Sequence, residues 1–334
     1  MANVIIGIHG LGNKPPKDLL EKWWRLSMAE GLKTNSLNVS LPKFEMVYWA
    51  DIIHDKPLDE SEKDRESPFF LEEGYSRAPE DFLVENHETR QKIVGFLSRQ
   101  MNRIFLNPDF SLNYSFIADT IVKNYFRDLE IYYTENCVDE NNATCKVKDL
   151  IRKRLLDVLE KYEDDDIMLV SHSMGSIIAF DVLSLLPLES KIHTFITMGS
   201  PLGLPVVISK IAAEQKQRLN GKNHMVTPDC ITNNWYNFSD ILDKVAFNYN
   251  LSDDFSSNIR GVKPIDFLVV NNYEKNGIRN PHKSFGYLRT REFSKVLYDF
   301  MKNEDITVWE KITRRPLHII RTLKTKLSST VKPK

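Results

Sequence analysis

The segment from Ile167 to Ile178 constrains the fold more than any other part of the chain. It opens with four consecutive apolar residues, passes through the turn S-H-S-M-G at residues 171–175, and continues into a stretch of helical character. A short, continuous apolar run followed at once by a helix is typical of a strand buried on both faces. The segment therefore predicts a buried strand that turns sharply into a helix.

The same alternation of apolar runs and helical stretches extends along most of the chain. Such alternation indicates an α/β fold with a mostly parallel central sheet and helices on both faces. We expect strands at Val4–Ile8, Phe44–Trp49, Ile167–Val170, His193–Met198, Trp235–Phe238 and Phe267–Val270, and helices at about Lys17–Leu32, Lys146–Lys161, Ser176–Leu185 and Thr290–Lys302.

Residues 55–145 interrupt this alternation. They are rich in charged and aromatic residues, and they have a helical period around Asp81–Phe105 and Ser115–Tyr133. We expect a helical insertion, a lid or cap, within a main domain of residues 1–310. Its apolar segments either form a core of its own or face the functional site, where they favour an apolar ligand. These segments are Phe69–Leu71, Phe82–Leu83, Ile104–Leu106 and Tyr125–Phe126.

Composition excludes several classes of protein. A hydrophobic content of 42% is enough for a folded core, and a net charge of −1 gives no overall attraction to nucleic acid. Three cysteines without a C-x-x-C pair predict neither a disulfide framework nor a structural zinc site. No run reaches the ~18–20 apolar residues of a membrane span, and the N-terminus lacks the basic region of a secretory signal. We therefore expect a soluble, cytoplasmic protein.

The C-terminal tail, residues 311–334, has a different charge from the rest. It holds eight Lys and Arg and no Asp or Glu, so subtracting its +8 from the total of −1 leaves −9 on residues 1–310. Leu317, Ile320, Leu323 and Leu327 follow a helical spacing between basic residues. This pattern suits a short amphipathic helix in peripheral contact with an anionic membrane; a solvated tail against the acidic body is the alternative.

The turn at residues 171–175 has the small residues that a sharp strand-to-helix turn requires. Ser171 precedes Ser173 by two positions and Gly175 follows it by two, which lets the strand and the helix approach closely. The turn lifts the Ser173 hydroxyl to the N-terminus of the helix, where free amides and the helix dipole favour developing negative charge. An ordinary strand–turn–helix junction is the alternative interpretation.

This segment resembles the nucleophile elbow of serine esterases and lipases of the α/β-hydrolase superfamily, with Ser171 in place of the first glycine of their G-x-S-x-G pattern. The resemblance implies an α/β-hydrolase fold with Ser173 as nucleophile. The H-G-L-G sequence at residues 9–12 matches the oxyanion loop of lipase-like members, and it implies that the backbone amides of Leu11 and Met174 form the oxyanion hole. A dinucleotide-binding turn is the alternative, but Pro15 stands where that fingerprint needs a glycine.

A serine nucleophile needs a general base, which in this superfamily comes late in the chain, in the order Ser, Asp, His. The sequence N-P-H-K-S-F-G-Y-L at residues 280–288 resembles the N-P-H-x-x-x-G-Y-L segment of lipase-like members and implies that His282 is the base. We expect His9 to brace the oxyanion loop. His172, within the elbow, and His318, in the basic tail, are not expected to act as bases.

The acid that orients the base has two candidates. The family-like pattern ends in L-D-P-V-A after a strand, and Asp243 matches it although Lys244 replaces the proline. Asp240 lies closer to the end of the predicted strand and is the alternative acid if the turn is shorter. The acid accepts the imidazole N–H and stabilises the imidazolium. The structural alternative for either residue is an exposed turn carboxylate.

Together these motifs predict a serine hydrolase that cleaves carboxylic esters, with lipid acyl esters as one candidate class, through an acyl-enzyme intermediate. No metal or organic cofactor is implied. The same residues would serve for thioesters or amides. Two alternatives remain from other classes. One is a non-catalytic binding or scaffold protein of α/β-hydrolase fold recruited to a membrane or partner; the other is an oxidoreductase that binds NAD(P).

Overall fold

The computed structural model describes residues 2–82, 127–134, 136–138, 144–185, 191–214, 225–246 and 248–302. Its centre is a six-stranded sheet in the order β10-β8-β6-β5-β1-β2, and every neighbouring pair of strands in it is parallel. The predicted α/β class with a parallel sheet is therefore confirmed. The strands are β1 (Asn3–Ile8), β2 (Lys43–Val47), β5 (Asp166–His172), β6 (Ile192–Met198), β8 (Ile231–Asp240) and β10 (Pro264–Val269).

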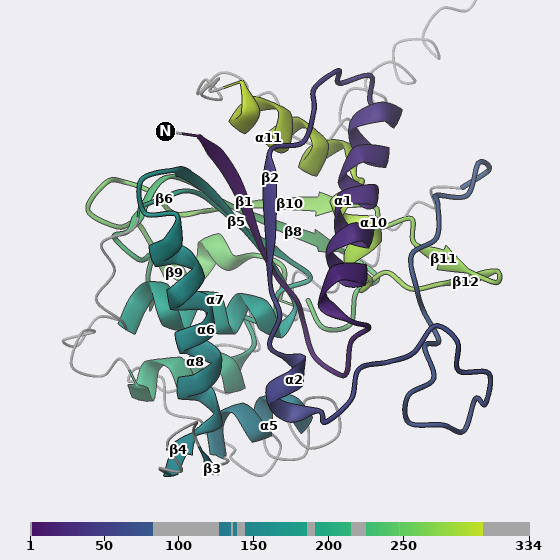
Figure 1. The fold of residues 1–334 in the computed structure, drawn as a ribbon. Coiled ribbons are helices and arrows are strands. Elements are labelled where there is room, and N and C mark those ends of the chain that lie inside the picture. Colours follow the sequence, from purple (N-terminus) through teal and green to yellow (C-terminus); the bar gives the residue numbers. More distant parts are fainter. Residues whose placement is uncertain are drawn as a thin grey trace, which may run out of the picture.

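Helices cover both faces of this sheet (Figure 1). One face packs against three helices that follow the insertion: α6 (Val147–Lys161), α7 (Met174–Leu185) and α8 (Pro205–Glu214). The other face packs against helices from the two ends of the described chain: α1 (Lys17–Thr34), α10 (Ser284–Leu288) and α11 (Arg291–Met301). The smaller elements are α2 (Ala50–Ile53), α5 (Arg127–Thr134), β3 (Asn136–Val138), β4 (Thr144–Lys146), β7 (Met225–Val226), η1 (Leu251–Asp253), β9 (Phe255–Ser256), β11 (Glu274–Lys275) and β12 (Ile278–Arg279).

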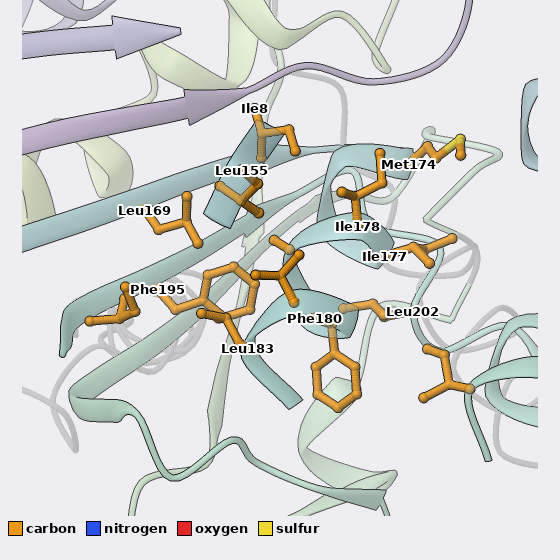
Figure 2. Close-up of a cluster of buried hydrophobic side chains, with 14 of the residues drawn as sticks. Ile8, Leu155, Leu169, Met174, Ile177, Ile178, Phe180, Leu183, Phe195 and Leu202 are labelled. Atoms are coloured by element: carbon orange, nitrogen blue, oxygen red, sulfur yellow. The ribbon is translucent and has the colours of Figure 1, made fainter. Parts of the chain in front are cut away.

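Burial on both faces explains the unbroken apolar runs in the strands. In β5, Ile167 and Leu169 belong to the core on the α7 side, whereas Met168 and Val170 belong to the core on the α1 side. Figure 2 shows the first of these cores, which includes Leu169 of β5 and Ile178 and Phe180 of α7. Each fully buried aliphatic or aromatic side chain contributes about 1.5–3 kcal/mol, so strands of this kind are stable only between two helical layers.

The insertion is described only in part. The predicted helix at Asp81–Phe105 lies almost entirely outside the described residues, and α5 coincides with the end of the one predicted at Ser115–Tyr133. The short antiparallel pair β3 and β4 was not predicted, nor was α8. The predicted tail, residues 311–334, lies outside the described residues. In the described part of the chain, no helix has the length and hydropathy needed to cross a membrane.

The order in which strands are added to the sheet changes direction at β1. From β1 the chain moves to β2 on one side, and after the insertion it returns to β5 on the other side. In open α/β sheets, the loops that follow neighbouring parallel strands diverge at such a point. The loop after β1 and the turn after β5 lie at this position, which is where ligands bind in open α/β sheets.

Candidate active site

The turn after β5 brings Ser173 to the start of α7. Ser173 has φ of 53°, an uncommon backbone conformation for a residue other than glycine, and α7 begins at the next residue. A Cβ atom at Gly175 would lie 2.6 Å from the carbonyl oxygens of both Ile8 and His9. Only glycine therefore lets α7 pack this closely against β1, as the small-residue spacing predicted.

Ser171 occupies the position where the resembled pattern has a glycine. Its side chain is fully buried, and its hydroxyl donates a hydrogen bond of 2.7 Å to the carbonyl oxygen of Ile196 in β6. A buried hydroxyl without a partner would cost about 1–3 kcal/mol, and this hydrogen bond removes that cost. Serine is thus accommodated here without strain on the turn.

Three side chains that are far apart in the sequence meet at the carboxyl ends of the strands. Nε2 of His282 lies 3.0 Å from Oγ of Ser173, and Nδ1 of His282 lies 2.8 Å from Oδ2 of Asp243. A carboxylate only accepts hydrogen bonds, so in the neutral ring Nδ1 carries the proton and Nε2 is left to accept from the serine hydroxyl. The Asp243 side chain is fully buried, whereas that of His282 is 29% exposed.

Asp240, the alternative acid, has a different set of partners. Its Oδ1 accepts from the backbone N–H of Leu242, and its Oδ2 accepts from the backbone N–H of Asn271 and from Nη2 of Arg279, at 2.7–2.8 Å. Burial raises the pKa of Asp240, while these N–H groups and the guanidinium oppose the rise. The geometry therefore places Asp243 against His282 and gives Asp240 an ion pair with Arg279.

Tyr287 joins the two aspartates. Its hydroxyl donates to Oδ2 of Asp243 at 2.7 Å and accepts from the backbone N–H of Asp240 at 2.9 Å. Burial and the nearby carboxylate of Asp243 hold the pKa of Tyr287 well above its ordinary value, so the hydroxyl keeps its proton and remains a donor. Tyr287 belongs to the motif around His282, but the sequence alone indicates no role for it.

Gly199, which directly follows β6, lies beside Asp243 and His282. It has φ of 54°, and an added Cβ would lie 2.8 Å from Oδ2 of Asp243 and 3.0 Å from Nδ1 of His282. Such contacts are too short for any side chain, so glycine is required here both by conformation and by space. The only sequence signal was a glycine at the end of a predicted strand.

The loop after β1 runs against Ser173. A Cβ atom at Gly10 would lie 2.6 Å from Cβ of Ser173, so the backbone next to Leu11 passes close to the serine. Met174 is the first residue of α7, and amides in the first turn of a helix have no acceptor within the helix. The two amides predicted to form the oxyanion hole thus belong to segments that flank Ser173.

His9 anchors this loop to the body of the protein. Its Nε2 accepts a hydrogen bond of 3.0 Å from the backbone N–H of Trp49, and its ring stacks on the indole at 4.8 Å between centroids. Since Nε2 accepts, Nδ1 carries the proton and donates to the carbonyl oxygen of Gly10 at 2.9 Å. Burial and the nearby charge of Lys14 keep the pKa of His9 well below its ordinary value, so the ring is neutral.

Lys14 fixes the carbonyl groups of the same loop. Its ammonium donates to the carbonyl oxygens of Leu11 and Gly12, the latter at 2.8 Å. Gly12 has φ of 79°, which allows the backbone to turn around the ammonium. The loop therefore has a defined shape set by a residue of its own sequence.

His172 holds the backbone of His282. Its Nε2 lies 2.6 Å from the carbonyl oxygen of His282, so Nε2 carries a proton and donates it, and the two rings lie 4.8 Å apart. Burial, with a smaller effect of His282, keeps the pKa of His172 well below its ordinary value. His172 is thus a neutral hydrogen-bond donor beside the candidate base. His318 lies outside the described residues.

Within the described residues, no three His, Cys, Asp or Glu side chains are arranged as metal ligands. No protein-family model matches this chain, and no curated protein matches its sequence. The functional interpretation therefore depends on the geometry of Ser173, His282 and Asp243.

Proposed function

We propose that this protein is a serine hydrolase of the α/β-hydrolase fold that cleaves carboxylic esters through an acyl-enzyme intermediate. One observation carries the proposal, the continuous hydrogen-bond series from Ser173 through His282 to Asp243. A hydroxyl, an imidazole and a buried carboxylate in this order are the groups that activate a serine nucleophile. Their position at the carboxyl ends of parallel strands beside a reversal in strand order supports the same interpretation.

The first half of the reaction forms the acyl-enzyme. Oγ of Ser173 attacks the carbonyl carbon of the ester while Nε2 of His282 takes the hydroxyl proton. Asp243 accepts the Nδ1–H and stabilises the imidazolium that forms. The oxyanion of the tetrahedral intermediate accepts hydrogen bonds from the amides of Leu11 and Met174. His282 then gives its proton to the leaving alkoxide, and the alcohol departs.

The second half releases the acyl group. His282 takes a proton from a water molecule, and the resulting hydroxide attacks the carbonyl carbon of the acyl-enzyme. The tetrahedral intermediate collapses, His282 returns the proton to Oγ of Ser173, and a carboxylic acid leaves. A neutral His172 beside the base suits this cycle, because it adds no positive charge that would oppose formation of the imidazolium.

Apolar side chains from the site loops favour an apolar acyl group. Leu11 and Val245, which come from the loops after β1 and β8, are partly buried against a core that includes Met174 and Leu202. An apolar surface of this kind binds hydrocarbon better than polar groups. We expect p-nitrophenyl esters of longer acyl chains to react with higher kcat/KM than the acetate. A strict preference for small polar acyl groups would contradict this part of the proposal.

Hydrolysis of p-nitrophenyl butyrate tests the proposed reaction. The unaltered protein should release p-nitrophenol, and Ser173→Ala should reduce kcat by at least about 10³-fold because the nucleophile is lost. Ser257→Ala is the matched control, since Ser257 is exposed and lies outside the candidate site. If Ser173→Ala were as active as Ser257→Ala, a non-catalytic role for this fold would be the better interpretation.

A further inference from the structure

A chain of side-chain contacts connects His282 to the segment that leads into the insertion. The backbone N–H of His282 donates to Oδ1 of Asn280 at 3.0 Å. Nδ2 of the same amide donates to both carboxylate oxygens of Glu73, at 3.0 and 2.8 Å. Nζ of Lys283 donates to Oε2 of Glu73 at 3.0 Å. Glu73 is 207 positions away from Asn280 in the sequence, so this contact is tertiary.

Glu73 determines which way the Asn280 amide points. An amide has one donor end and one acceptor end, whereas a carboxylate only accepts. With Glu73 in place, the NH₂ group must face the carboxylate, and the carbonyl oxygen must face the N–H of His282. Burial alone would raise the pKa of Glu73, but Lys283 and the amide of Asn280 lower this pKa by more than burial raises it. The carboxylate therefore remains ionised and can only accept hydrogen bonds.

The same segment contacts the loop after β1 at its other end. The backbone N–H of Leu58 donates to the carbonyl oxygen of Lys14 at 2.9 Å, and Nδ2 of Asn13 donates to the carbonyl oxygen of Lys56 at 2.8 Å. Asn13 and Lys14 directly follow the predicted oxyanion loop. Residues 56–58 therefore contact one of the site loops, and Glu73 contacts the other.

A bridge between backbone groups connects these two contact points. The N–H of Asp59 donates to the carbonyl oxygen of Phe69 at 2.9 Å, and Asp59 pairs with Phe70 as an isolated parallel bridge. Beyond Glu73, the hydroxyl of Tyr273 donates to the carbonyl oxygen of Gly74 at 2.7 Å. Figure 1 shows this part of the chain beside the β11–β12 hairpin, which immediately precedes the His282 loop.

We propose that residues 56–73 form a brace that fixes the Leu11 loop relative to the His282 loop, and that Glu73 is a positioning residue that acts on His282 through Asn280. The inference rests on the proposed function, because it assigns these contacts to the same site. A displacement of about 1 Å in a catalytic group can reduce a rate by about 100-fold. A contact that holds the backbone of the base is therefore expected to affect kcat rather than substrate binding.

Exchanging the carboxylate of Glu73 and the amide of Asn280 tests this role. Asn280→Asp keeps an acceptor for His282 but sets one carboxylate against another, and it should slow labelling by a fluorophosphonate probe by about 10–100-fold. Glu73→Gln alone retains a carbonyl acceptor and should slow labelling by less. The double variant, which combines Asn280→Asp with Glu73→Gln, places an amide donor at position 73 opposite a carboxylate acceptor at position 280. Its rate of labelling should therefore return to within about threefold of that of the unaltered protein. Glu160→Gln, at an exposed position on α6 outside the brace, is the matched control and should leave the rate unchanged.

Steady-state rates with p-nitrophenyl butyrate separate positioning from binding. We expect Asn280→Asp to lower kcat with little change in KM, and the double variant to recover kcat. A double variant no faster than Asn280→Asp alone, a loss confined to KM, or an equal loss in Glu160→Gln would each overturn the inference. If Asn280→Asp does not fold, Glu73→Ala replaces it. Labelling about tenfold slower is then expected, and unchanged labelling overturns the inference.

The two proposals fail in different ways. If the unaltered protein does not react with the probe at all, the proposed function fails and the brace fails with it. If the unaltered protein reacts and Asn280→Asp reacts equally fast while remaining folded, only the brace fails. Thermal unfolding of each variant, followed by circular dichroism, shows which variants are folded.

Discussion

The hydroxyl of Tyr287 donates a 2.7 Å hydrogen bond to Oδ2 of Asp243, the same oxygen that lies 2.8 Å from Nδ1 of His282. The carboxylate is thus held from a second direction while it faces the imidazole. The tyrosine hydroxyl also accepts from the backbone N–H of Asp240, so it ties the acid to the end of β8. In the proposed mechanism, Tyr287 therefore orients the acid without itself reacting.

Replacement of Tyr287 by Phe should weaken both activity and stability. It removes a hydrogen bond to a carboxylate and leaves the buried N–H of Asp240 without its acceptor, which costs about 1–3 kcal/mol in free energy of unfolding. We expect kcat for p-nitrophenyl butyrate to fall by about tenfold. Tyr298→Phe on α11 is the control, and it should change neither kcat nor the urea midpoint appreciably. Equal kcat in the two variants would exclude the orienting role of Tyr287.

The two aspartates should respond differently to the same substitution. Asp243→Asn places an NH₂ group against Nδ1 of His282 and favours the wrong tautomer, so kcat should fall by about 10³–10⁴-fold. Asp240→Asn removes the ion pair with Arg279 and should lower the free energy of unfolding by about 1–3 kcal/mol, with kcat changed only a few fold. Steady-state kinetics and urea unfolding of both variants measure the contrast. The reverse pattern would make Asp240 the acid.

Comparison of Gly199→Ala with Gly261→Ala should separate the effect of backbone strain from the effect of a steric clash at the candidate site. The added Cβ meets Asp243 and His282, and it also imposes an αL conformation that costs Ala about 1–2 kcal/mol. Gly261 has φ of 75° and open space around its Cα, so Gly261→Ala has the strain without the clash. We expect a larger loss of stability in Gly199→Ala, where the clash adds to the strain, and a loss of kcat only in that variant. Comparable kcat values would show that the site tolerates the extra carbon.

The buried histidines should make the protein less stable in mild acid. His9 and His172 are buried and neutral, with pKa values held well below the 6.5 of a free histidine. Below about pH 6.5 the unfolded chain therefore binds more protons than the native state, and the free energy of unfolding falls as the pH falls. The slope reaches up to about 1.4 kcal/mol per pH unit for each histidine. Urea unfolding between pH 8 and pH 5.5 measures it, and a flat profile would contradict burial of the neutral rings.

Much of the fold follows from local sequence patterns. The inner strands β1, β5 and β6 were predictable because each holds an apolar run that is buried between two helical layers, and the helices at 17–34 and 147–161 have clear amphipathic spacing. The edge strands β2 and β10 are partly exposed and are marked by shorter apolar runs. Helix α8 was missed because Pro205–Glu214 is mostly buried and largely apolar, so it lacks a polar face that would reveal its period. The strands β3 and β4 are too short for periodicity to detect.

The residues of the candidate site that lie in local sequence motifs could be predicted. The residues whose role depends on tertiary contacts could not. The turn around Ser173 and the segment around His282 carry such motifs. The choice between Asp243 and Asp240 stayed open in the sequence because both follow the same strand; Arg279 and Tyr287 distinguish them only once the loops are folded. Glu73 gave no signal, because nothing in the sequence around it indicates a partner 207 positions away.

Mass spectrometry of the protein after reaction with a fluorophosphonate tests the central claim most directly. We predict one adduct per chain, located on Ser173 by peptide mapping, with no adduct in Ser173→Ala and much slower formation in His282→Ala. His193→Ala serves as the control for loss of a histidine outside the site. An adduct on another residue, or reaction of Ser173→Ala at the rate of the unaltered protein, would contradict the account.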